Sequence, residues 1–326
     1  MRQATKISQN KLLSLMGKAK SVLLTTHENP DGDGLGSIIA LGLALRAKGK
    51  KIYLFSKDPV PVNYQFLPNQ KLIKNTLKTK IKFDLTLLVD VGEMERVGSC
   101  VQEYPHKGLT ISIDHHAASQ HNTQMVYCLP KESSSGEIVL ALLKKMKTKM
   151  TQTIATNLYT AIATDTGAFK YSNTTQKTFQ NAAYLCRFGV DVWDVALNCF
   201  ETYTPARMNL LKKAIGSINI HANKKVAWII LEAKDFKATK TSSQDAEGFI
   251  NYPRAIDGVE VALFFKEKSS RCYKISMRSK KYVNVAKIAA KFGGGGHVRA
   301  SGCTLNGTLS TVRDKILQTI VPLLKS

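Results

Sequence analysis

The segment at residues 27–37, which reads HENPDGDGLGS, carries the side chains best suited to chemistry in this sequence of 326 residues. His27, Asp31 and Asp33 crowd into one glycine-rich turn between a predicted strand and a predicted helix. Two close carboxylates repel each other unless a cation lies between them. Carboxylates bind hard divalent cations, and imidazole also suits manganese, iron or zinc. The alternative is an ordinary turn with a helix cap, because Asp and Gly are common in turns.

Two single aspartates also stand where an apolar segment ends. Asp90 directly follows residues 83–89, which have the composition of a buried strand, and Asp165 lies in a turn after another apolar segment. One carboxylate at the end of a strand is weak evidence for a site when it is taken alone. The two aspartates support a metal site only if the fold brings them close to the turn at residues 27–37.

The group Asp114-His115-His116 directly follows the apolar residues 109–113. Neighbouring side chains of an extended segment point in opposite directions, so we expect at most one of the two imidazoles to face a given metal. Together the four segments supply enough carboxylate and imidazole for two divalent ions, and a pair of ions about 3.5–4 Å apart is common in phosphoryl chemistry. Three other histidines lack such neighbours and are predicted to be surface or core residues: His106, His121 and His221.

A second motif, GGGGHVRASG at residues 293–302, follows a predicted helix. One glycine is enough to end a helix, so four in a row indicate a further role. Exposed backbone N–H groups of such a segment can cradle a phosphate, and nearby side chains can add donors. The predicted substrate-binding residues are Arg278, Gly294, Gly295, Gly296, His297 and Arg299.

Apolar, β-branched runs alternate with helical patterns through the first part of the chain. The expected strands are residues 22–26, 52–55, 83–89 and 109–113, and the expected helices are residues 35–47 and 137–146. This alternation indicates βαβ units and a parallel sheet. Folds of this class place their sites at the carboxyl ends of the strands, where the polar groups described above stand.

The alternation of predicted strands and helices changes near residue 190. Residues 192–218 are predicted to be mostly helical, with an interruption near Pro205. The expected strands then come at close spacing, at residues 226–231, 259–265 and 272–277, with a hairpin loop at 268–270 and a helix at 285–292. The sequence therefore predicts an α/β protein with a parallel-sheet domain (1–190), a helical linker (191–220) and a smaller α/β domain (221–326).

The composition is that of an ordinary globular protein, with 44% hydrophobic and 22% charged residues. The first twenty residues contain no apolar signal segment, and no apolar run approaches the ~20 residues of a membrane helix, so we expect a cytoplasmic protein. The six scattered cysteines form no C-x-x-C pair and are expected to be reduced. The net charge of +23 favours an anionic partner, or else reflects lysine richness alone.

The four segments that carry Asp and His and the glycine-rich motif at 293–302 make five motifs. In their order and spacing, these motifs resemble the DHH phosphoesterase superfamily over nearly the whole chain. The C-terminal motif resembles GGGGHxxAxG, the hallmark of the family's DHHA1 domain. The bacterial nano-RNase and pAp-phosphatase group is the most similar branch. The resemblance implies an N-terminal DHH catalytic domain that binds metal, a substrate-binding DHHA1 domain, two manganese ions, a cytoplasmic location and a homodimer.

The resemblance also implies roles for individual residues. One metal ion is expected at His27, Asp31 and Asp90. The other is expected at Asp33, Asp90, His115 and Asp165, with Asp90 as the bridge. The expected catalytic residues are Asp90, Asp114, His115 and His116, with Asp114 as a support and His116 near the phosphate. The segment 133–137 (SSSGE) differs from relatives that often have threonine there.

The implied function is a manganese-dependent phosphoesterase. It would hydrolyse short oligoribonucleotides (nanoRNA and dinucleotides such as pApA), 3′-phosphoadenosine 5′-phosphate (pAp), or both, to mononucleotides. One alternative is a cyclic-dinucleotide (c-di-AMP) phosphodiesterase of the same family. Another class is a catalytically dead nucleotide-binding sensor, which the complete set of expected ligands disfavours. A basic nucleic-acid-binding protein without catalysis would need aromatic stacking platforms, and the 8% aromatic residues form no such stripe.

Overall fold

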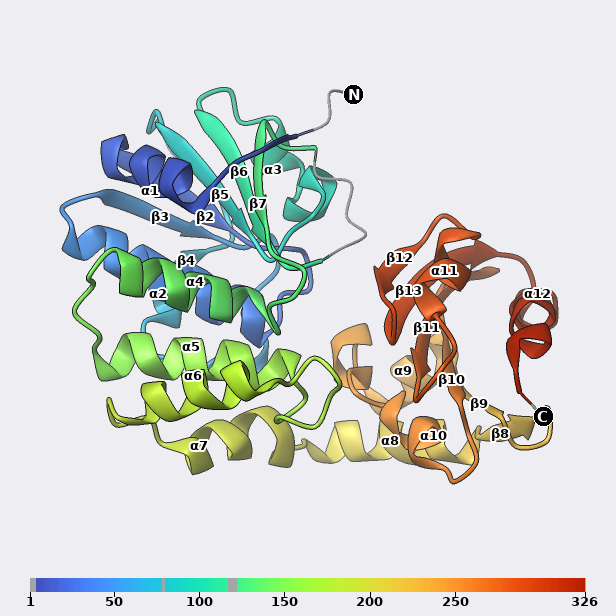
Figure 1. Ribbon diagram of the computed structural model, residues 1–326. Coiled ribbons are helices and arrows are strands. Elements are labelled where there is room, and N and C mark those ends of the chain that lie inside the picture. The colour runs from blue at the N-terminus through green and yellow to red at the C-terminus, as the bar shows by residue number, and fades with distance from the viewer. Residues whose placement is uncertain (1–3, 78–79, 117–121, 326) are drawn as a thin grey trace. The chain divides into compact units, whose positions relative to one another are not determined.

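The computed structural model describes residues 4–77, 80–116 and 122–325. Its contacts divide the chain into two compact units, Met1–Thr202 and Tyr203–Ser326. Figure 1 shows the first unit in blue to olive and the second in yellow to red. Each unit has its own sheet and its own core.

The first unit contains a parallel sheet in the order β1-β7-β6-β5-β2-β3-β4. Its strands are β1 (Thr5–Lys6), β2 (Ser21–Thr25), β3 (Lys51–Phe55), β4 (Ile73–Lys74), β5 (Leu85–Val89), β6 (Leu109–Asp114) and β7 (Met125–Cys128). The four strands expected in this part of the sequence are confirmed. The chain runs outward from β2 to β4 and then returns to β5, so the order reverses between β2 and β5. In open α/β sheets, ligands bind at the carboxyl ends of the strands beside such a reversal.

Helices cover both faces of this sheet. They are α1 (Gln9–Lys18), α2 (Gly32–Ala47), α3 (Ser99–Gln102), α4 (Ser135–Lys145), α5 (Gln152–Asp165), α6 (Gln176–Cys186) and α7 (Val192–Ala196). Helices α1, α2 and α4 bury apolar side chains against one face, whereas α3 lies over the other. Figure 1 shows α5 and α6 stacked beyond α2 and α4.

The start of α2 is packed too closely for side chains at its glycines. A Cβ atom on Gly34 would lie 2.1 Å from Oγ1 of Thr26, and one on Gly36 would lie 2.3 Å from the carbonyl oxygen of Asn157. Nearly all of α2 is buried between the sheet and α5. These glycines therefore let the first turn of α2, which carries Asp31 and Asp33, approach the end of β2 and the helix α5.

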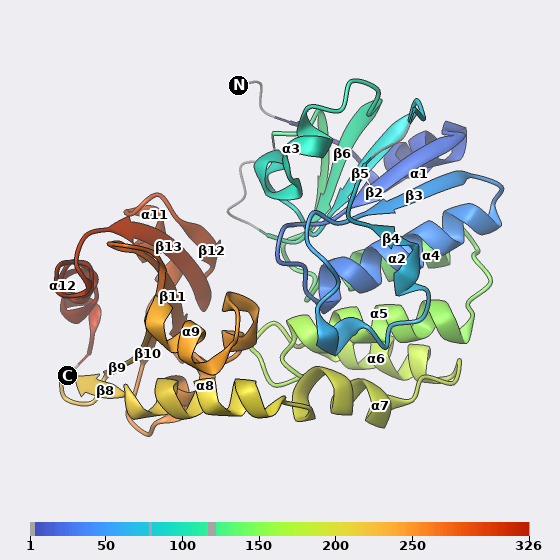
Figure 2. The ribbon, with the colours of Figure 1, turned by 180° about the vertical axis from the view of Figure 1, so that it is seen from behind.

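The second unit contains a mixed sheet in the order β12-β13-β11-β10-β9-β8, in which only β9 and β10 run parallel. Its strands are β8 (Asn219–His221), β9 (Val226–Leu231), β10 (Val261–Ser269), β11 (Cys272–Ser279), β12 (Gly295–His297) and β13 (Ala300–Asn306). Its helices are α8 (Pro205–Gly216), α9 (Ala233–Thr239), α10 (Asn251–Ala255), α11 (Val285–Ala290) and α12 (Leu309–Ile320). Helices α11 and α12 pack on one face, and α8 to α10 cover part of the other (Figure 2).

The expected elements of the second half are present, with two differences. The helical stretch is interrupted as predicted, since a π-helix at Leu197–Glu201 follows α7 and α8 begins only at Pro205. The hairpin loop is tighter than expected, because β10 extends to Ser269 and only Ser270 and Arg271 turn. The helix predicted to end at Phe292 ends at Ala290.

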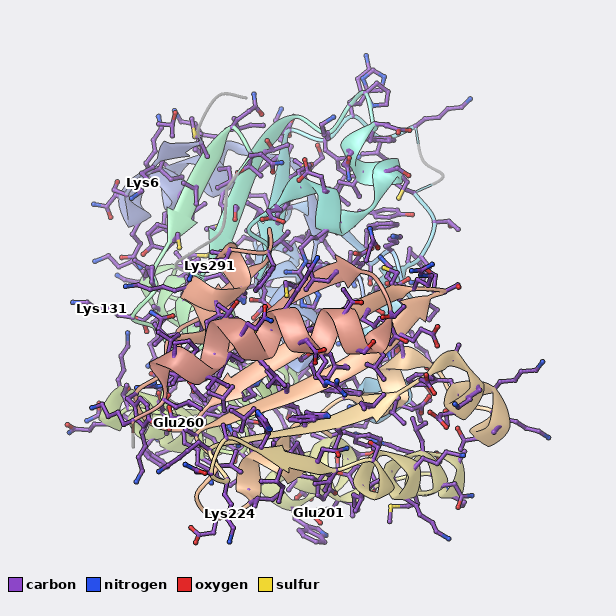
Figure 3. All side chains as sticks on the ribbon, turned by 90° about the vertical axis from the view of Figure 1, so that its right-hand side faces the viewer. Lys6, Lys131, Glu201, Lys224, Glu260 and Lys291 are labelled. Atoms are coloured by element: carbon purple, nitrogen blue, oxygen red, sulfur yellow. The ribbon has the colours of Figure 1, made fainter. Side chains whose placement is uncertain are left out.

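Surface lysines project outward in Figure 3, where Lys6, Lys131, Lys224 and Lys291 are labelled and all four are exposed.

Across the described residues, no helix combines the length and the apolar character that a membrane crossing requires.

A buried carboxylate holds the loop between β11 and α11. Glu260 is 3% exposed and accepts hydrogen bonds from the N–H groups of Lys281 (2.9 Å), Tyr282 (2.8 Å) and Val283 (2.9 Å). Replacement by glutamine would set an amide N–H₂ group against these donors. We expect Glu260→Gln to lower the free energy of unfolding of the second unit by about 2 kcal/mol. Hydrogen exchange of the 281–283 amides should become faster.

The measurement is the melting temperature together with hydrogen exchange of peptides that contain residues 281–283. The matched control is Asp257→Asn, because Asp257 is exposed in the same unit. Such a surface change should cost less than about 0.5 kcal/mol. Equal exchange rates in wild type and Glu260→Gln would contradict this account of the loop.

Candidate active site

The predicted metal-binding side chains meet at the carboxyl ends of the central strands of the first unit. His27 lies two residues after β2, and Asp90 directly follows β5. These two strands are neighbours and flank the reversal in strand order. Asp114 is the last residue of β6, and Asp165 is the last residue of α5. Four elements that are far apart in sequence thus present their ends to one place.

His27, Asp31 and Asp90 form the first group of possible ligands. Nε2 of His27 lies 3.7 Å from Oδ1 of Asp31 and 3.5 Å from Oδ2 of Asp90. Nδ1 of His27 donates a hydrogen bond to the carbonyl oxygen of Glu28 at 2.8 Å, which leaves Nε2 to face the carboxylates. Asp31 also caps α2, because its Oδ1 accepts hydrogen bonds from the N–H groups of Asp33 and Gly34, both at 3.0 Å. The helix-cap interpretation therefore also holds for Asp31.

Asp33, His115 and Asp165 form the second group. Nε2 of His115 lies 3.8 Å from Oδ2 of Asp33 and 3.5 Å from Oδ2 of Asp165. It also lies 3.6 Å from Oδ1 of Asp90, whereas His27 faces Oδ2 of the same carboxylate. The two oxygens of Asp90 thus face the two groups separately, which is the arrangement that a bridging ligand needs.

Asp114 orients the two adjacent histidines. Its Oδ1 accepts hydrogen bonds from the backbone N–H groups of His115 (2.8 Å) and His116 (3.2 Å) and lies 2.7 Å from Nδ1 of His116. The expectation that the two imidazoles point apart is wrong. Their centroids are 4.6 Å apart, and Nδ1 of His116 lies 3.6 Å from Oδ1 of Asp90. The pleat of the strand no longer applies here, because β6 ends at Asp114.

The start of α4 supplies hydrogen bonds that the sequence did not reveal. The N–H groups of Ser135 (2.7 Å) and Gly136 (2.8 Å) donate to the carboxylate of Asp33. Oγ of Ser135 lies 3.2 Å from Oδ1 of Asp90. The segment 133–137 thus contacts two predicted metal ligands. Asn173 is a second missed residue, since its Nδ2 donates to the carbonyl oxygen of Asp165 at 3.1 Å.

The carboxylates of this cluster destabilise one another. Burial, together with the charges of Asp90, Asp165 and Asp31, holds the pKa of Asp33 well above its usual range. Burial likewise raises the pKa of Asp165 to about 6, against the opposing charge of His115. The protonated forms of these acids are favoured because too much negative charge is concentrated in a site that water reaches poorly.

The neighbouring carboxylates raise the pKa values of the imidazoles and so favour their charged forms. Burial disfavours the charged form of His27, but Asp31 and Asp90 outweigh it and raise its pKa to about 10. Burial opposes protonation of His116 as well, and Asp114 raises the pKa of that histidine to about 9. The cluster therefore attracts positive charge. Divalent cations fit this donor set, and the mixture of carboxylate and imidazole suits manganese, iron or zinc better than calcium.

The predicted substrate-binding residues lie in the second unit. His297 of β12 pairs with Ala300 of β13, and Ala300 pairs with Arg278 of β11. Paired residues share a face of the sheet, so Arg278 and His297 flank the small Ala300 on one face. Gly295 pairs with Gly302, and the backbone at Gly296 has a φ of 132°.

Three of the predicted substrate-binding residues make hydrogen bonds within the second unit, and Nη1 of Arg278 donates to the carbonyl oxygen of Met277 at 3.1 Å. The N–H of Gly294 donates to the carbonyl oxygen of Ala289 at 2.9 Å, so the expectation that this N–H is open to a phosphate is wrong. A Cβ atom there would lie 2.1 Å from the carbonyl oxygen of Gly302, so close packing requires this glycine. Arg299 lies in the turn after β12, and its Nη1 donates to the carbonyl oxygen of Val283 at 3.2 Å.

The remaining histidines are not drawn into the site. His106 and His221 are exposed, as expected for surface residues. His121 lies outside the described residues. The assignment of individual metal and substrate ligands stays a prediction, although the geometry is compatible with it.

Comparison with known proteins defines the class. Residues 21–162 match the family model for the N-terminal domain of the DHH family, and residues 213–326 match the DHHA1 domain. The chain therefore belongs to the DHH/DHHA1 phosphoesterase superfamily and is an enzyme of this hydrolase class.

Individual relatives match nearly end to end. The chain is 29% identical to the bifunctional oligoribonuclease and PAP phosphatase NrnA of Thermus thermophilus, over 92% of this chain and 89% of that protein. It is 27% identical to the probable bifunctional oligoribonuclease and PAP phosphatase NrnA of Streptococcus mutans, over 96% and 98% of the two chains. A crystal structure of an exopolyphosphatase-related protein from Bacteroides fragilis superposes with a TM-score of 0.86 at 25% identity, covering 98% of this chain and 97% of that one.

Metal binding should release protons. Without metal, the raised pKa of His27, about 10, keeps its imidazole protonated at neutral pH, and the metal must displace that proton. The affinity of the chelator-treated protein for Mn²⁺ should therefore rise with pH from 6 to 8. Calorimetric titration in buffers of different ionisation enthalpy measures the protons released. An observed enthalpy that is the same in every buffer would contradict this expectation.

Proposed function

We propose that the chain is a manganese-dependent phosphoesterase that hydrolyses short oligoribonucleotides and pAp to mononucleotides. The observation that carries the proposal is the position of Asp90, whose two carboxylate oxygens face two separate groups of Asp and His ligands. The names of the relatives from Thermus thermophilus and Streptococcus mutans support the choice of substrates.

Two divalent ions would be held by the two groups. His27, Asp31 and Asp90 would hold one ion, and Asp33, Asp90, His115 and Asp165 would hold the other. When bound, such a pair lowers the pKa of a water molecule to give a nucleophile near neutral pH and neutralises charge on a phosphoryl group. Manganese is the proposed metal because both groups combine imidazole with carboxylates.

The chain's own residues would orient and stabilise the reacting groups. Asp114 fixes Nδ1 of His116 at 2.7 Å, which directs the other ring nitrogen of His116 away from Asp114. The hydrogen bond and the charge of Asp114 favour the protonated imidazole of His116, which would donate to a phosphoryl oxygen as negative charge develops there. The N–H groups of Ser135 and Gly136 keep Asp33 in place.

The second unit is proposed to bind the nucleotide. Arg278 and His297 share one face of its sheet and can donate hydrogen bonds to a phosphate. The division into a catalytic domain (1–190), a helical linker (191–220) and a substrate-binding domain (221–326) is part of this proposal. So are the cytoplasmic location and the homodimer that the family resemblance implies.

The experiment that tests the proposal is a turnover panel with pAp, pApA, an RNA trimer and c-di-AMP, each with Mn²⁺ and with excess chelator. We expect Mn²⁺-dependent turnover of the first three. Preferred turnover of c-di-AMP would instead support the cyclic-dinucleotide phosphodiesterase, and binding without turnover of any substrate would support a sensor.

Asp90→Asn should reduce turnover of pAp by at least about a thousand-fold, because an amide cannot bridge two cations as a carboxylate does. Asparagine is the suitable replacement, since Asp90 has a φ of 62° and asparagine tolerates this left-handed conformation. The melting temperature without metal should therefore stay close to that of wild type. The control is Glu103→Gln at an exposed site. Asp90→Asn turnover above a tenth of wild type at saturating Mn²⁺ would rule out the bridging role.

His297→Ala should lower kcat/KM for pAp by about ten- to a hundred-fold, as expected for the loss of one charge-assisted hydrogen bond. Metal content should stay at the wild-type level, because every proposed metal ligand lies in the first unit. The control is His221→Ala, an exposed histidine of the same unit. Unchanged kinetics with a lower melting temperature would instead give His297 a packing role.

A further inference from the structure

One face of the second sheet carries more cationic side chains than the GGGGH motif alone accounts for. Along β11, Tyr273, Ile275 and Met277 are buried, and the residues between them face the other side. The side chains on that other side include Lys274 and Arg278. The part of this side on β11, β13 and β12 is called the open face below, and on β10 the same side is partly covered by α8 and by residues 249–250.

The open face is organised in rows of paired residues. The first row contains Arg278, Ala300 and His297. The next row contains Ser276, Gly302 and Gly295, with Phe264 of β10 on the far side of Ser276. A ligand that lies over Gly302 and Gly295 can approach the backbone closely, because neither residue has a side chain.

The third row places two lysines opposite each other. Lys274 of β11 pairs with Lys266 of β10 on one side and with Thr304 of β13 on the other. Like charges directly opposite on neighbouring strands destabilise a sheet. Burial and the charge of Lys274 lower the pKa of Lys266 to about 8, although Glu247 opposes this. A phosphate bound beside the pair would add to the opposing charge of Glu247.

Lys266 is held in position beside this row. Its Nζ donates to the hydroxyl of Ser243 and, at 3.2 Å, to the carbonyl oxygen of the same residue. Its Nζ also lies 6.0 Å from the ring centroid of Phe264. Lys266 is therefore a partly buried cation with a defined position, whereas Lys274 beside it is exposed.

The distance between the first and third rows determines what could use both. Lys274 and Arg278 are four residues apart on one strand, which corresponds to about 13 Å. A phosphate beside Arg278 and His297 and a phosphate beside Lys266 and Lys274 would therefore be separate groups of one ligand. A chain of nucleotides supplies such groups, because its phosphates repeat along an extended backbone.

We propose that Lys266 and Lys274 form a second phosphate-binding site, which takes a backbone phosphate of an oligoribonucleotide whose first phosphate lies at Arg278 and His297. This inference rests on the proposed function and adds a determinant of substrate length. Oligonucleotides long enough to reach the third row gain an interaction that pAp cannot make.

Binding of a 5′-fluorescein-labelled RNA pentamer tests the inference, by fluorescence polarisation in excess chelator so that no hydrolysis occurs. The variants are Lys274→Gln and the double variant Lys266→Gln/Lys274→Gln, which remove charge and keep most of the side-chain length. We expect the double variant to bind about five- to ten-fold more weakly. The slope of log affinity against log salt concentration should fall by about 0.7 for each phosphate that the variant no longer neutralises.

The kinetic counterpart is the ratio of kcat/KM for the pentamer to kcat/KM for pAp, which should fall by a similar factor. Lys274→Arg keeps the charge and should retain the wild-type ratio. The matched control is Lys315→Ala, because Lys315 is exposed on α12, which covers the opposite face of the sheet. The melting temperature of each variant confirms that it is folded.

Two results would overturn the inference. One is a double variant with the affinity and salt slope of wild type, and the other is an equal loss of affinity in Lys315→Ala, which would mean that any surface lysine matters as much. Failure of the proposed function has a different signature. Wild-type protein would then turn over neither pAp nor RNA with Mn²⁺, while the polarisation measurement would still decide whether the lysine pair binds RNA.

Discussion

Mutual repulsion among buried carboxylates is the constraint on which the first unit depends. Burial and the charges of Asp90, Asp165 and Asp31 all raise the pKa of Asp33. The surrounding structure offsets this cost with donors: the N–H groups at the start of α4 bind Asp33, and His27 and His115 face Asp90 from two sides. Divalent cations complete the same compensation, so the arrangement that costs stability without metal is the one that prepares the site for metal.

The fold brings these charges together through its topology. Parallel strands deliver the residues that follow them to a single edge, and the reversal between β2 and β5 leaves room there for a ligand. Close packing at Gly34 and Gly36 brings the first turn of α2 to that edge. In the second unit, buried and non-buried side chains alternate along β11. This alternation places the core on one side of the strand and Arg278 and Lys274 on the other.

Much of the site could be predicted because its residues stand where apolar strands end, and Asp90 and Asp114 were found in this way. Contacts between segments that are distant in the sequence could not be predicted. The hydrogen bond from Ser135 to Asp33 joins residues 102 positions apart, and Asn173 carries no local signal. The orientation of His115 and His116 was predicted wrongly because it depends on where β6 ends. The role of Gly294 depends on the approach of β13, which the sequence does not show.

The central claim is that Asp90 lies between two metal ions. Anomalous diffraction at the manganese absorption edge, from crystals grown with Mn²⁺, tests it most directly. The account predicts two peaks beside Asp90, one at His27 and Asp31 and the other at Asp33, His115 and Asp165. A single peak, or two peaks that do not share Asp90, would contradict it.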